Sequence, residues 1–281
     1  MCTRRHTVSI LKELSMITYE TLISEAKERG MPGVKTRGIL REYLQVLILK
    51  ELYRLEAGKK FCFTGGTYLR LVHRAKRFSE DLDFNAAKLT EIEFEGVLKK
   101  IASALKKEGM TATLQFDHWQ NMWAAQLIFP DIESAYGVIS KYSKKKGVVI
   151  KVEVNQPRWK IDPETLVVSG FGQMFPVVCS QKGALFADKI DALLKKDRTR
   201  HLFDIIFMLS AHYPIDERVL KTLGIKDPPF AMILNRVENL SLIELKHQAE
   251  ALRPFLFDES EAELIVNAKT IIRQLIERYQ R

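Results

Sequence analysis

The chain has 281 residues, 46% of them hydrophobic, so it can bury a sizeable core in one large domain or two smaller ones. Lys and Arg number 44 against 35 Asp and Glu, which gives a formal net charge of +9 and suits a polyanionic partner such as nucleic acid or a nucleotide. No apolar run approaches the roughly 18 residues of a membrane span, and no signal-peptide core follows the N-terminus. We therefore expect a cytoplasmic protein without a membrane partner.

Residues 16–55 show helical spacing that is interrupted at Gly30-Met31-Pro32-Gly33, where proline and glycine cannot continue a helix. From residue 59 the hydrophobic period changes between that of strands and that of helices. Strands are predicted at residues 61–64, 79–84, 111–116, 123–129 and 148–155, and helices at 68–74 and 91–107. The pattern is typical of an α/β (α+β) core with a mixed sheet.

After Ser180 only helical spacing remains. Helices are predicted at residues 182–196, 201–212, 231–240, 242–252 and 261–279. The chain is therefore predicted to have an N-terminal helical segment (residues 1–58), an α/β core (59–180) and a C-terminal helical lobe (181–281).

The cysteines and histidines form no metal-binding or disulfide pattern. Cys2, Cys62 and Cys179 are odd in number and unpaired in spacing, which argues against a disulfide framework. Cys62 and Cys179 lie in apolar stretches and are expected in the core. The six histidines show no zinc motif, so zinc is not the expected metal.

Two aspartates alternate with apolar residues in the predicted strand 79–84. Successive side chains of a strand point to opposite faces, so Asp81 and Asp83 share a face with Ser79 while Leu82 and Phe84 enter the core. Two carboxylates held close together repel each other unless a cation lies between them. Mg²⁺ is the expected cation, because it prefers oxygen ligands and leaves room for phosphate oxygens.

A glycine pair precedes these aspartates. Gly65, Gly66 and Thr67 lie between a predicted strand and a predicted helix, where glycine lets the backbone approach a ligand closely and free N–H groups can bind phosphate. Alone, Gly-Gly-Thr usually marks a tight turn, and Asp-x-Asp usually marks a solvated sheet face. Together in one strand–helix–strand unit they predict a site for a metal-bound nucleoside triphosphate.

The predicted strand 148–155 also alternates, and it places Lys151, Glu153 and Asn155 on one face. If this strand neighbours that of Asp81, Glu153 becomes a third carboxylate and the candidate base for the proton of an incoming hydroxyl. Lys151 would then be a cation near the phosphates. The alternative is an exposed cross-strand Lys–Glu pair.

Four segments, in this order, carry a resemblance to a known family: Gly65-Gly66-Thr67, Arg77-Phe78-Ser79-Glu80-Asp81-Leu82-Asp83-Phe84, Ile150-Lys151-Val152-Glu153-Val154 and Ala187-Asp188-Lys189-Ile190-Asp191-Ala192-Leu193. Together they resemble the AbiEii/AbiGii toxin family, the nucleotidyltransferase-fold toxins of type IV toxin–antitoxin and abortive-infection systems, which include the mycobacterial MenT toxins. The resemblance covers roughly residues 16–215.

The resemblance implies a nucleotidyltransferase-fold core and Mg²⁺-dependent transfer of a nucleotide from an NTP. In several members the acceptor is the tRNA 3′ end, and the modification stops growth; a cognate antitoxin protein is the implied partner. Asp81 and Asp83 correspond to the metal ligands. Lys189 matches the family lysine and could reach the triphosphate, although a lysine on an amphipathic helix is more often solvated.

The chain departs from the family pattern after this lysine. The family continues with a basic residue and Asp-Leu-Tyr-Asp, whereas this chain has Arg200 followed by His201-Leu202-Phe203-Asp204. Asp204 keeps the second acidic position, and we assign it to nucleotide binding. If the missing carboxylate anchors the helix, His201 is harmless; if it contacts the nucleotide, activity or base choice differs.

Two basic clusters indicate where an RNA acceptor lies. One lies between the glycine pair and the aspartates, and the other is the stretch 141–146, which contains one tyrosine. Lysines neutralise backbone phosphates and a tyrosine can stack on a base, although a solvated hairpin tip explains the second cluster almost as well. The candidate RNA contacts are Arg74, Arg77, Lys144, Lys145 and Lys146.

Two classes of function stand at this point. The first is an NTP-dependent nucleotidyltransferase toxin that acts on RNA, with transfer to a protein or a small molecule as a variant. The second is a non-catalytic member of the fold that binds nucleotide, RNA or its antitoxin. The presence of Asp81, Asp83, Lys151 and Glu153 favours the enzyme.

Overall fold

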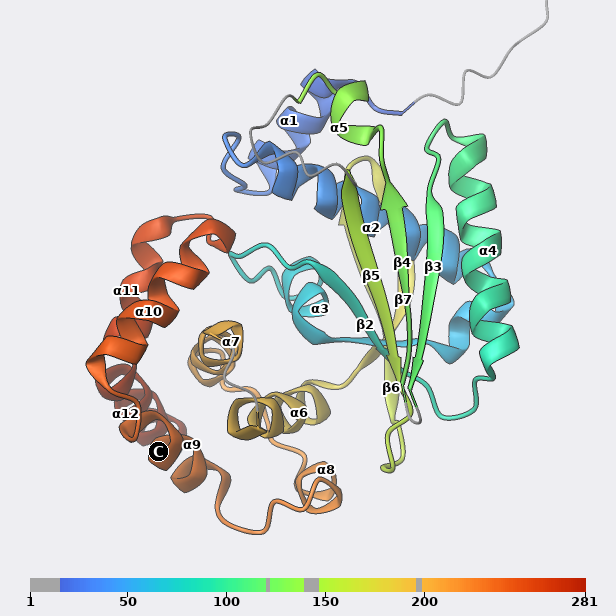
Figure 1. Cartoon of the computed structure of the whole chain (residues 1–281). Coiled ribbons are helices and arrows are strands. Elements are labelled where there is room, and N and C mark those ends of the chain that lie inside the picture. Colours follow the sequence, from blue (N-terminus) through green and yellow to red (C-terminus); the bar gives the residue numbers. More distant parts are fainter. Residues whose placement is uncertain (1–15, 120–121, 139–146, 196–198) are drawn as a thin grey trace, which may run out of the picture.

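The computed structural model describes residues 16–119, 122–138, 147–195 and 199–281, and a seven-stranded mixed sheet forms its centre (Figure 1). The strand order is β3-β4-β5-β2-β1-β7-β6, in which the pairs β2–β5 and β1–β7 are parallel and the others antiparallel. The strands are β1 (Cys62–Thr64), β2 (Asp81–Asn85), β3 (Thr113–Trp119), β4 (Met122–Phe129), β5 (Val148–Asn155), β6 (Pro163–Gly170) and β7 (Gln173–Ser180).

Helices α1 (Tyr19–Glu28), α2 (Thr36–Arg54) and α4 (Glu91–Lys107) belong to the N-terminal half of the fold (Figure 1). Helix α2 is apolar around most of its circumference, and twelve of its residues are buried, as expected for a helix enclosed by other elements. Helix α4 begins with a capping box in which Thr90 and Glu93 bind each other's backbone N–H groups. A short helix, α5 (Ile132–Ala135), follows β4.

The remaining helices are α3 (Gly65–Leu71), α6 (Lys182–Lys195), α7 (Thr199–Ser210), α8 (Glu217–Thr222), α9 (Pro229–Glu238), α10 (Leu242–Leu252), α11 (Glu263–Val266) and α12 (Ala268–Tyr279). Helices α9 to α12 curve around the outside of α6 and α7, which lie between them and the rest of the molecule (Figure 1). This arrangement places α6 and α7 where they can cover polar groups of the sheet.

The segment after α10 joins the C-terminal helices to the core. The Phe78 N–H donates to the Phe255 carbonyl at 2.8 Å, and the Phe257 N–H donates to the Lys76 carbonyl at 3.1 Å. These two bonds form a short antiparallel bridge to the segment that leads directly into β2. The C-terminal helices are thus fixed to the backbone that positions the two aspartates.

The predicted fold class, an α/β structure with a mixed sheet and helices at both ends, is confirmed. Helix α4 and strand β5 have the predicted bounds, and the buried cysteines Cys62 and Cys179 lie in the core. Three predictions were wrong: α3 begins at Gly65 instead of Tyr68, the helix predicted at 261–279 is broken near Asn267, and strands β6 and β7 were missed. In the parts of the chain that the structure describes, no helix combines the length and apolar character needed to cross a membrane.

Candidate active site

Strands β2 and β5 run side by side and carry matching rows of polar side chains. Asp81 pairs in register with Lys151, Asp83 with Glu153, and Asn85 with Asn155. The hypothesis that the two strands are neighbours is therefore confirmed. The intervening side chains enter the core, where the Phe84 ring packs 5.6 Å from that of Phe61 and 5.5 Å from that of Phe63.

A cavity of about 610 Å³ lies between this sheet face and helices α6 and α7. Its volume falls within the range of pockets that hold nucleotide-sized ligands. Nine predicted site residues line it: Gly65, Gly66, Arg77, Ser79, Asp81, Asp83, Lys151, Glu153 and Lys189. The geometry thus gathers most of the predicted site in one place.

The glycine pair allows the backbone to lie directly against the acidic groups. Gly65 has a φ of +80°, and a Cβ atom added there would lie 2.1 Å from Oδ2 of Asp83. A Cβ atom on Gly66 would lie 2.7 Å from Ser79 Oγ and from Arg77 Nη2. Any side chain at either position would therefore displace groups that line the cavity.

Burial and neighbouring negative charge raise the pKa values of Asp81 and Asp83. Burial raises the pKa of Asp81, and the charges of Glu153 and Glu80 add to this rise while Arg200 opposes it. Burial and the neighbouring charge of Asp81 raise the pKa of Asp83 to about 7, although Lys189 lowers it. Three carboxylates that repel one another around one volume fit a divalent cation, which would relieve the repulsion.

Lys151 and Glu153 form an ion pair with each other inside the cavity. Burial lowers the pKa of Lys151, but its contact with Glu153 and the charges of Asp81 and Asp83 outweigh this effect and raise it. The alternative interpretation was an exposed cross-strand Lys–Glu pair, whereas the observed pair lies within β5 and is half-buried. It lines the cavity, however, so it does not remove either residue from the site.

Asp204 and Arg77 bind each other beside the cavity. The Asp204 side chain is fully buried and accepts two hydrogen bonds from Arg77, at 2.8 and 2.9 Å. It also forms an ion pair with Lys189, at 2.8 Å. Burial raises the pKa of Asp204, but the two cations outweigh it and lower the pKa. The charged groups of Asp204 and Arg77 bind each other, and Arg77 also lines the cavity. The nucleotide contact of Asp204 and the RNA contact of Arg77 stay predictions.

Thr67 and Arg74 are not among the residues that line the cavity. Thr67 is fully buried and its hydroxyl donates to the Asp81 carbonyl, so it positions β2 instead of touching a ligand. Arg74 lines a second cavity, of about 460 Å³, together with Arg29, Arg70 and Lys76. The predicted RNA contacts Lys144, Lys145 and Lys146 fall outside the described residues.

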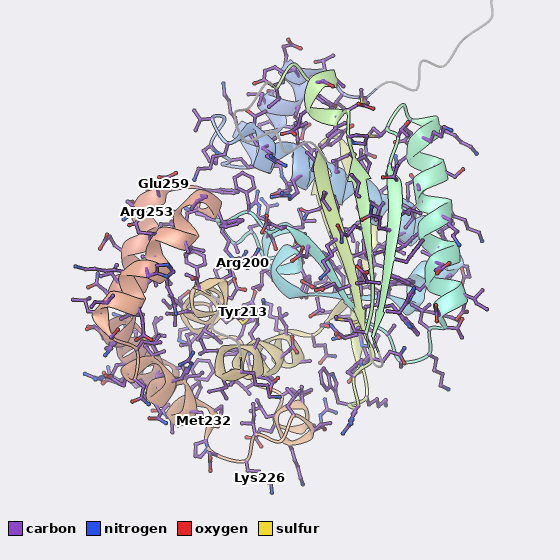
Figure 2. All side chains as sticks on the ribbon, viewed as in Figure 1. Arg200, Tyr213, Lys226, Met232, Arg253 and Glu259 are labelled. Atoms are coloured by element: carbon purple, nitrogen blue, oxygen red, sulfur yellow. The ribbon has the colours of Figure 1, made fainter. Side chains whose placement is uncertain are left out.

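Several lining residues were not predicted from the sequence. Arg200 enters from α7, between the C-terminal helices and the sheet (Figure 2), and its guanidinium lies 3.1 Å from Glu80. Glu80 also pairs with Arg41 of α2 at 3.1 Å, so these charges connect three elements around the cavity. The other unpredicted lining residues include Asn85, Asn155, Trp159, Asp188 and His201. The strand alternation could have identified Asn85, which lies two residues after Asp83.

A comparison with protein families identifies the family of the chain. Residues 47–264 match the family described as nucleotidyl transferase AbiEii toxin of type IV toxin–antitoxin systems. The chain belongs to the AbiEii nucleotidyltransferase toxin family. It is therefore a nucleotidyltransferase, and the family implies a nucleotide substrate and an antitoxin partner. No curated protein gives a significant match to the sequence.

Solved structures agree with this fold. The chain is similar to MenT4, a nucleotidyltransferase toxin from Mycobacterium tuberculosis, with a TM-score of 0.58 and 14% identity over 94% of this chain and 93% of that one. It is also similar to a putative nucleotidyltransferase from Helicobacter pylori, with a TM-score of 0.57 and 16% identity over 86% of this chain and 96% of that one. JHP933 from the same organism gives a TM-score of 0.54 and 15% identity over 86% of this chain and 93% of that one. At these identities the similarity shows a common fold.

Proposed function

We propose that this protein transfers a nucleotide from an NTP to RNA, at the 3′ end of tRNA, in a Mg²⁺-dependent reaction that inhibits growth. The observation that carries the proposal is the register pairing of Asp81 and Asp83 with Lys151 and Glu153 in a nucleotide-sized cavity. A cytoplasmic location and control by a cognate antitoxin complete the proposal.

In the proposed reaction the 3′ hydroxyl oxygen of the acceptor bonds to the α-phosphorus of the NTP. The bond from that phosphorus to the bridging oxygen breaks, and pyrophosphate leaves with the electron pair. Glu153 accepts the hydroxyl proton, and Lys151 beside it contributes positive charge toward the phosphates. Asp81 and Asp83 would hold Mg²⁺, which when bound neutralises phosphate charge.

Lys189 of α6 and the glycine pair beside Asp83 would hold the triphosphate. Asp204 and Arg77 do not contact substrate in this proposal: Asp204 fixes the Lys189 ammonium group at the cavity wall from behind. The close approach of Gly65 to Asp83 leaves no space for a side chain between the backbone and the proposed cation.

The deciding experiment is incubation of the purified protein with each labelled NTP, Mg²⁺ and total cell extract. We expect label in RNA, loss of labelling with a chelator, and recovery when Mg²⁺ is added back. Asp83→Asn should lower the rate at least about a hundredfold, because it removes a proposed metal ligand. The matched control is Asp117→Asn, the same change at an exposed position of β3, which should leave the rate unchanged. Label in protein, or label in neither RNA nor protein, would contradict RNA as the acceptor.

Glu153→Gln separates catalysis from binding. It should abolish transfer but keep NTP–Mg²⁺ affinity near wild type, whereas Lys151→Ala should weaken nucleotide affinity because its charge acts in the ground state as well. In a bacterial host, wild type should slow growth and Glu153→Gln should not, at equal protein levels. Equal toxicity of both strains would contradict catalysis as the cause of growth inhibition.

A further inference from the structure

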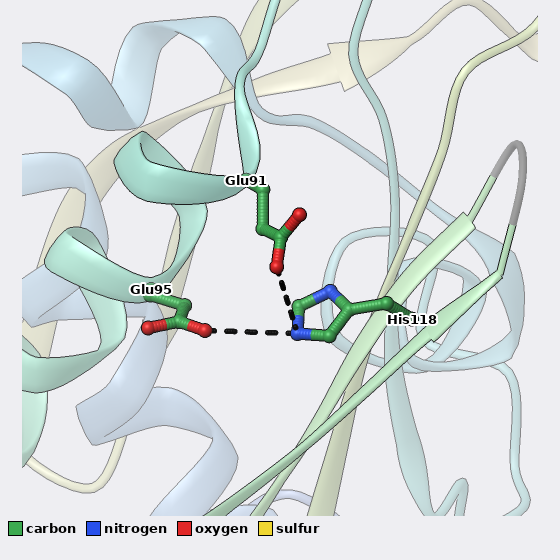
Figure 3. Close-up of side chains that lie close together, drawn as sticks. All are labelled: Glu91, Glu95 and His118. Carbon is green, nitrogen blue, oxygen red and sulfur yellow. Dashed lines mark ion pairs between the residues drawn. The ribbon is translucent and has the colours of Figure 1, made fainter.

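Three side chains with metal-ligating atoms face one another between α4 and β3, and none of them is among the residues that line the catalytic cavity (Figure 3). Glu91 and Glu95 lie one turn apart in the first half of α4, and His118 lies on β3. Nε2 of His118 is 3.6 Å from Oε1 of Glu91 and 3.6 Å from Oε1 of Glu95. All three ligand atoms lie within 4.8 Å of one another.

These separations suit a shared cation better than direct contact. At 3.6 Å a nitrogen and an oxygen are too far apart for a hydrogen bond. Two atoms that each lie 2.0–2.2 Å from the same tetrahedral metal ion are about 3.4 Å apart. The His118–Glu91 and His118–Glu95 distances are therefore close to those expected for ligands of one ion, and small side-chain rotations would complete the geometry.

The surrounding residues orient these ligands. Lys99 Nζ lies 2.7 Å from Oε2 of Glu95, so the other carboxylate oxygen faces His118. The four-residue spacing of Glu91 and Glu95 places both on one face of the helix. The His118 ring lies nearly parallel to that of Phe116, with 14° between their planes. Because Glu91 is 57% and His118 30% exposed, an ion and a water molecule have access from solvent.

We propose that Glu91, Glu95 and His118 form a second metal site, for Zn²⁺ or a similar transition-metal ion, which links α4 to the edge strand β3. Zn²⁺ binds both imidazole nitrogen and carboxylate oxygen, whereas Mg²⁺ prefers oxygen ligands alone. The role of the ion is structural: it joins two elements that lie outside the catalytic cavity. The sequence did not reveal the site, since His118 is separated by more than twenty residues from either glutamate.

Metal titration of the full-length protein tests the proposal. Asp83→Asn serves as the background, so that cation binding in the catalytic cavity is reduced and the second site is measured separately. We expect this chelator-treated protein to bind one equivalent of Zn²⁺ by calorimetry, to show a Co²⁺ absorption band with nitrogen ligation, and to gain thermal stability with Zn²⁺. Absence of Zn²⁺ binding would overturn the proposal.

Variants in the same background assign the ligands. His118→Ala and Glu95→Gln should each weaken Zn²⁺ binding by about tenfold or more and abolish the Zn²⁺-dependent rise in Tm. His247→Ala, at an exposed histidine of α10, is the matched control and should bind like the background. Circular dichroism without metal checks that each variant folds. If folded His118→Ala and Glu95→Gln bind Zn²⁺ as tightly as the control, the cluster is only a surface ion pair.

Discussion

Gly65 and Asp83 are the residues whose contact most directly determines the geometry of the active site. The backbone of Gly65 adopts a φ of +80°, and the Asp83 carboxylate occupies the space that a Cβ atom would need. A side chain at residue 65 therefore has two separate costs, the strain of a left-handed backbone and the displacement of a proposed metal ligand. Gly172 also has a positive φ, but an added Cβ atom there would meet no other group within 4 Å, so a substitution at Gly172 has only the backbone cost.

We predict that Gly65→Ala lowers kcat about a hundredfold or more, because displacing a catalytic group by an ångström has an effect of that order. Gly172→Ala is the matched control: its φ is +69°, but a Cβ atom there would meet nothing within 4 Å. Both variants should lose about 1–2 kcal/mol of stability from backbone strain. Steady-state kinetics and urea unfolding measure the two effects, and equal activity of the two variants would contradict the Asp83 contact.

The buried contact of Asp204 with Arg77 and Lys189 gives a second residue-scale prediction. Asp204→Asn leaves two buried cations without a counter-charge, so the free energy of unfolding should fall by about 3–5 kcal/mol. Glu238→Gln, which breaks the exposed pair with Arg273, should change it by less than about 1 kcal/mol. Urea unfolding measures both. Near wild-type stability combined with lost nucleotide affinity would instead restore Asp204 to nucleotide binding.

The predicted site residues that the structure brings together on two neighbouring strands share one property: local spacing decides their position. Asp81, Asp83, Lys151 and Glu153 each follow from strand alternation, which fixes the face of a side chain without knowledge of the rest of the fold. The contact of Arg77 with Asp204 was not predicted, because the two residues are 127 positions apart in the sequence. A basic residue beside an active site has the same local pattern whether it faces RNA or the interior.

Helices and strands were likewise predicted where local spacing decides them and missed where pairing between distant segments decides them. Helix α4 and strand β5 were predicted to the residue, since α4 has a capping box and a continuous apolar face and β5 alternates along its length. Strands β6 and β7 were missed. Strand β6 is at the edge of the sheet, and few of its residues are buried. The alternation of apolar and polar residues that predicts a strand is therefore weak there. Its register with β7 depends on pairing that only the folded chain reveals.

His73 connects the end of α3 to the segment after α7, and it makes the packing of these elements sensitive to acid. Its ring lies 4.8 Å from that of Tyr68 and 5.5 Å from that of Tyr213. Burial and the charge of Lys182 lower the pKa of His73 to about 4. Because the unfolded chain binds a proton near pH 6.5 and the folded chain only near pH 4, stability is lost as pH falls through this window.

We predict that His73→Phe removes part of this acid sensitivity. Wild type should lose about 1–2 kcal/mol more stability than the variant between pH 7 and pH 4.5, less than the full linkage value because the ring is partly exposed. Urea midpoints at the two pH values measure the difference. His247→Ala, at an exposed histidine, should follow wild type. Equal pH dependence of wild type and His73→Phe would show that His73 titrates normally in the folded protein.

At the scale of the whole molecule, the active site has walls from distant parts of the chain. The sheet supplies the carboxylates, while α6 and α7 supply Lys189 and Arg200. The division into segments at residues 58 and 180 remains a prediction, but the catalytic cavity requires the last two of these segments together. Contacts that hold the C-terminal helices to the core should therefore affect both stability and catalysis.

Lys35, just before α2, is one such contact. Its ammonium group donates to the Arg253 carbonyl at 2.9 Å and to the Leu256 carbonyl at 2.8 Å, and it pairs with Glu259 at 2.8 Å. Figure 2 places Arg253 and Glu259 together at the end of the C-terminal helices that faces the N-terminal part of the fold. The same short segment forms the bridge to residues 76–78, which lead into the catalytic strand β2.

We predict that Lys35→Gln lowers the free energy of unfolding by about 1–3 kcal/mol, because two backbone acceptors lose their charged donor. It should also speed hydrogen exchange at the Phe78 and Phe257 amides, since both depend on the bridge that Lys35 supports. Lys59→Gln, at an exposed lysine that pairs with Glu56 of its own turn, is the matched control and should change neither quantity. Lys35→Gln could be less stable than wild type and still show the same exchange rates at these two amides as Lys59→Gln. That result would show that Lys35 stabilises the fold without holding the C-terminal segment against β2.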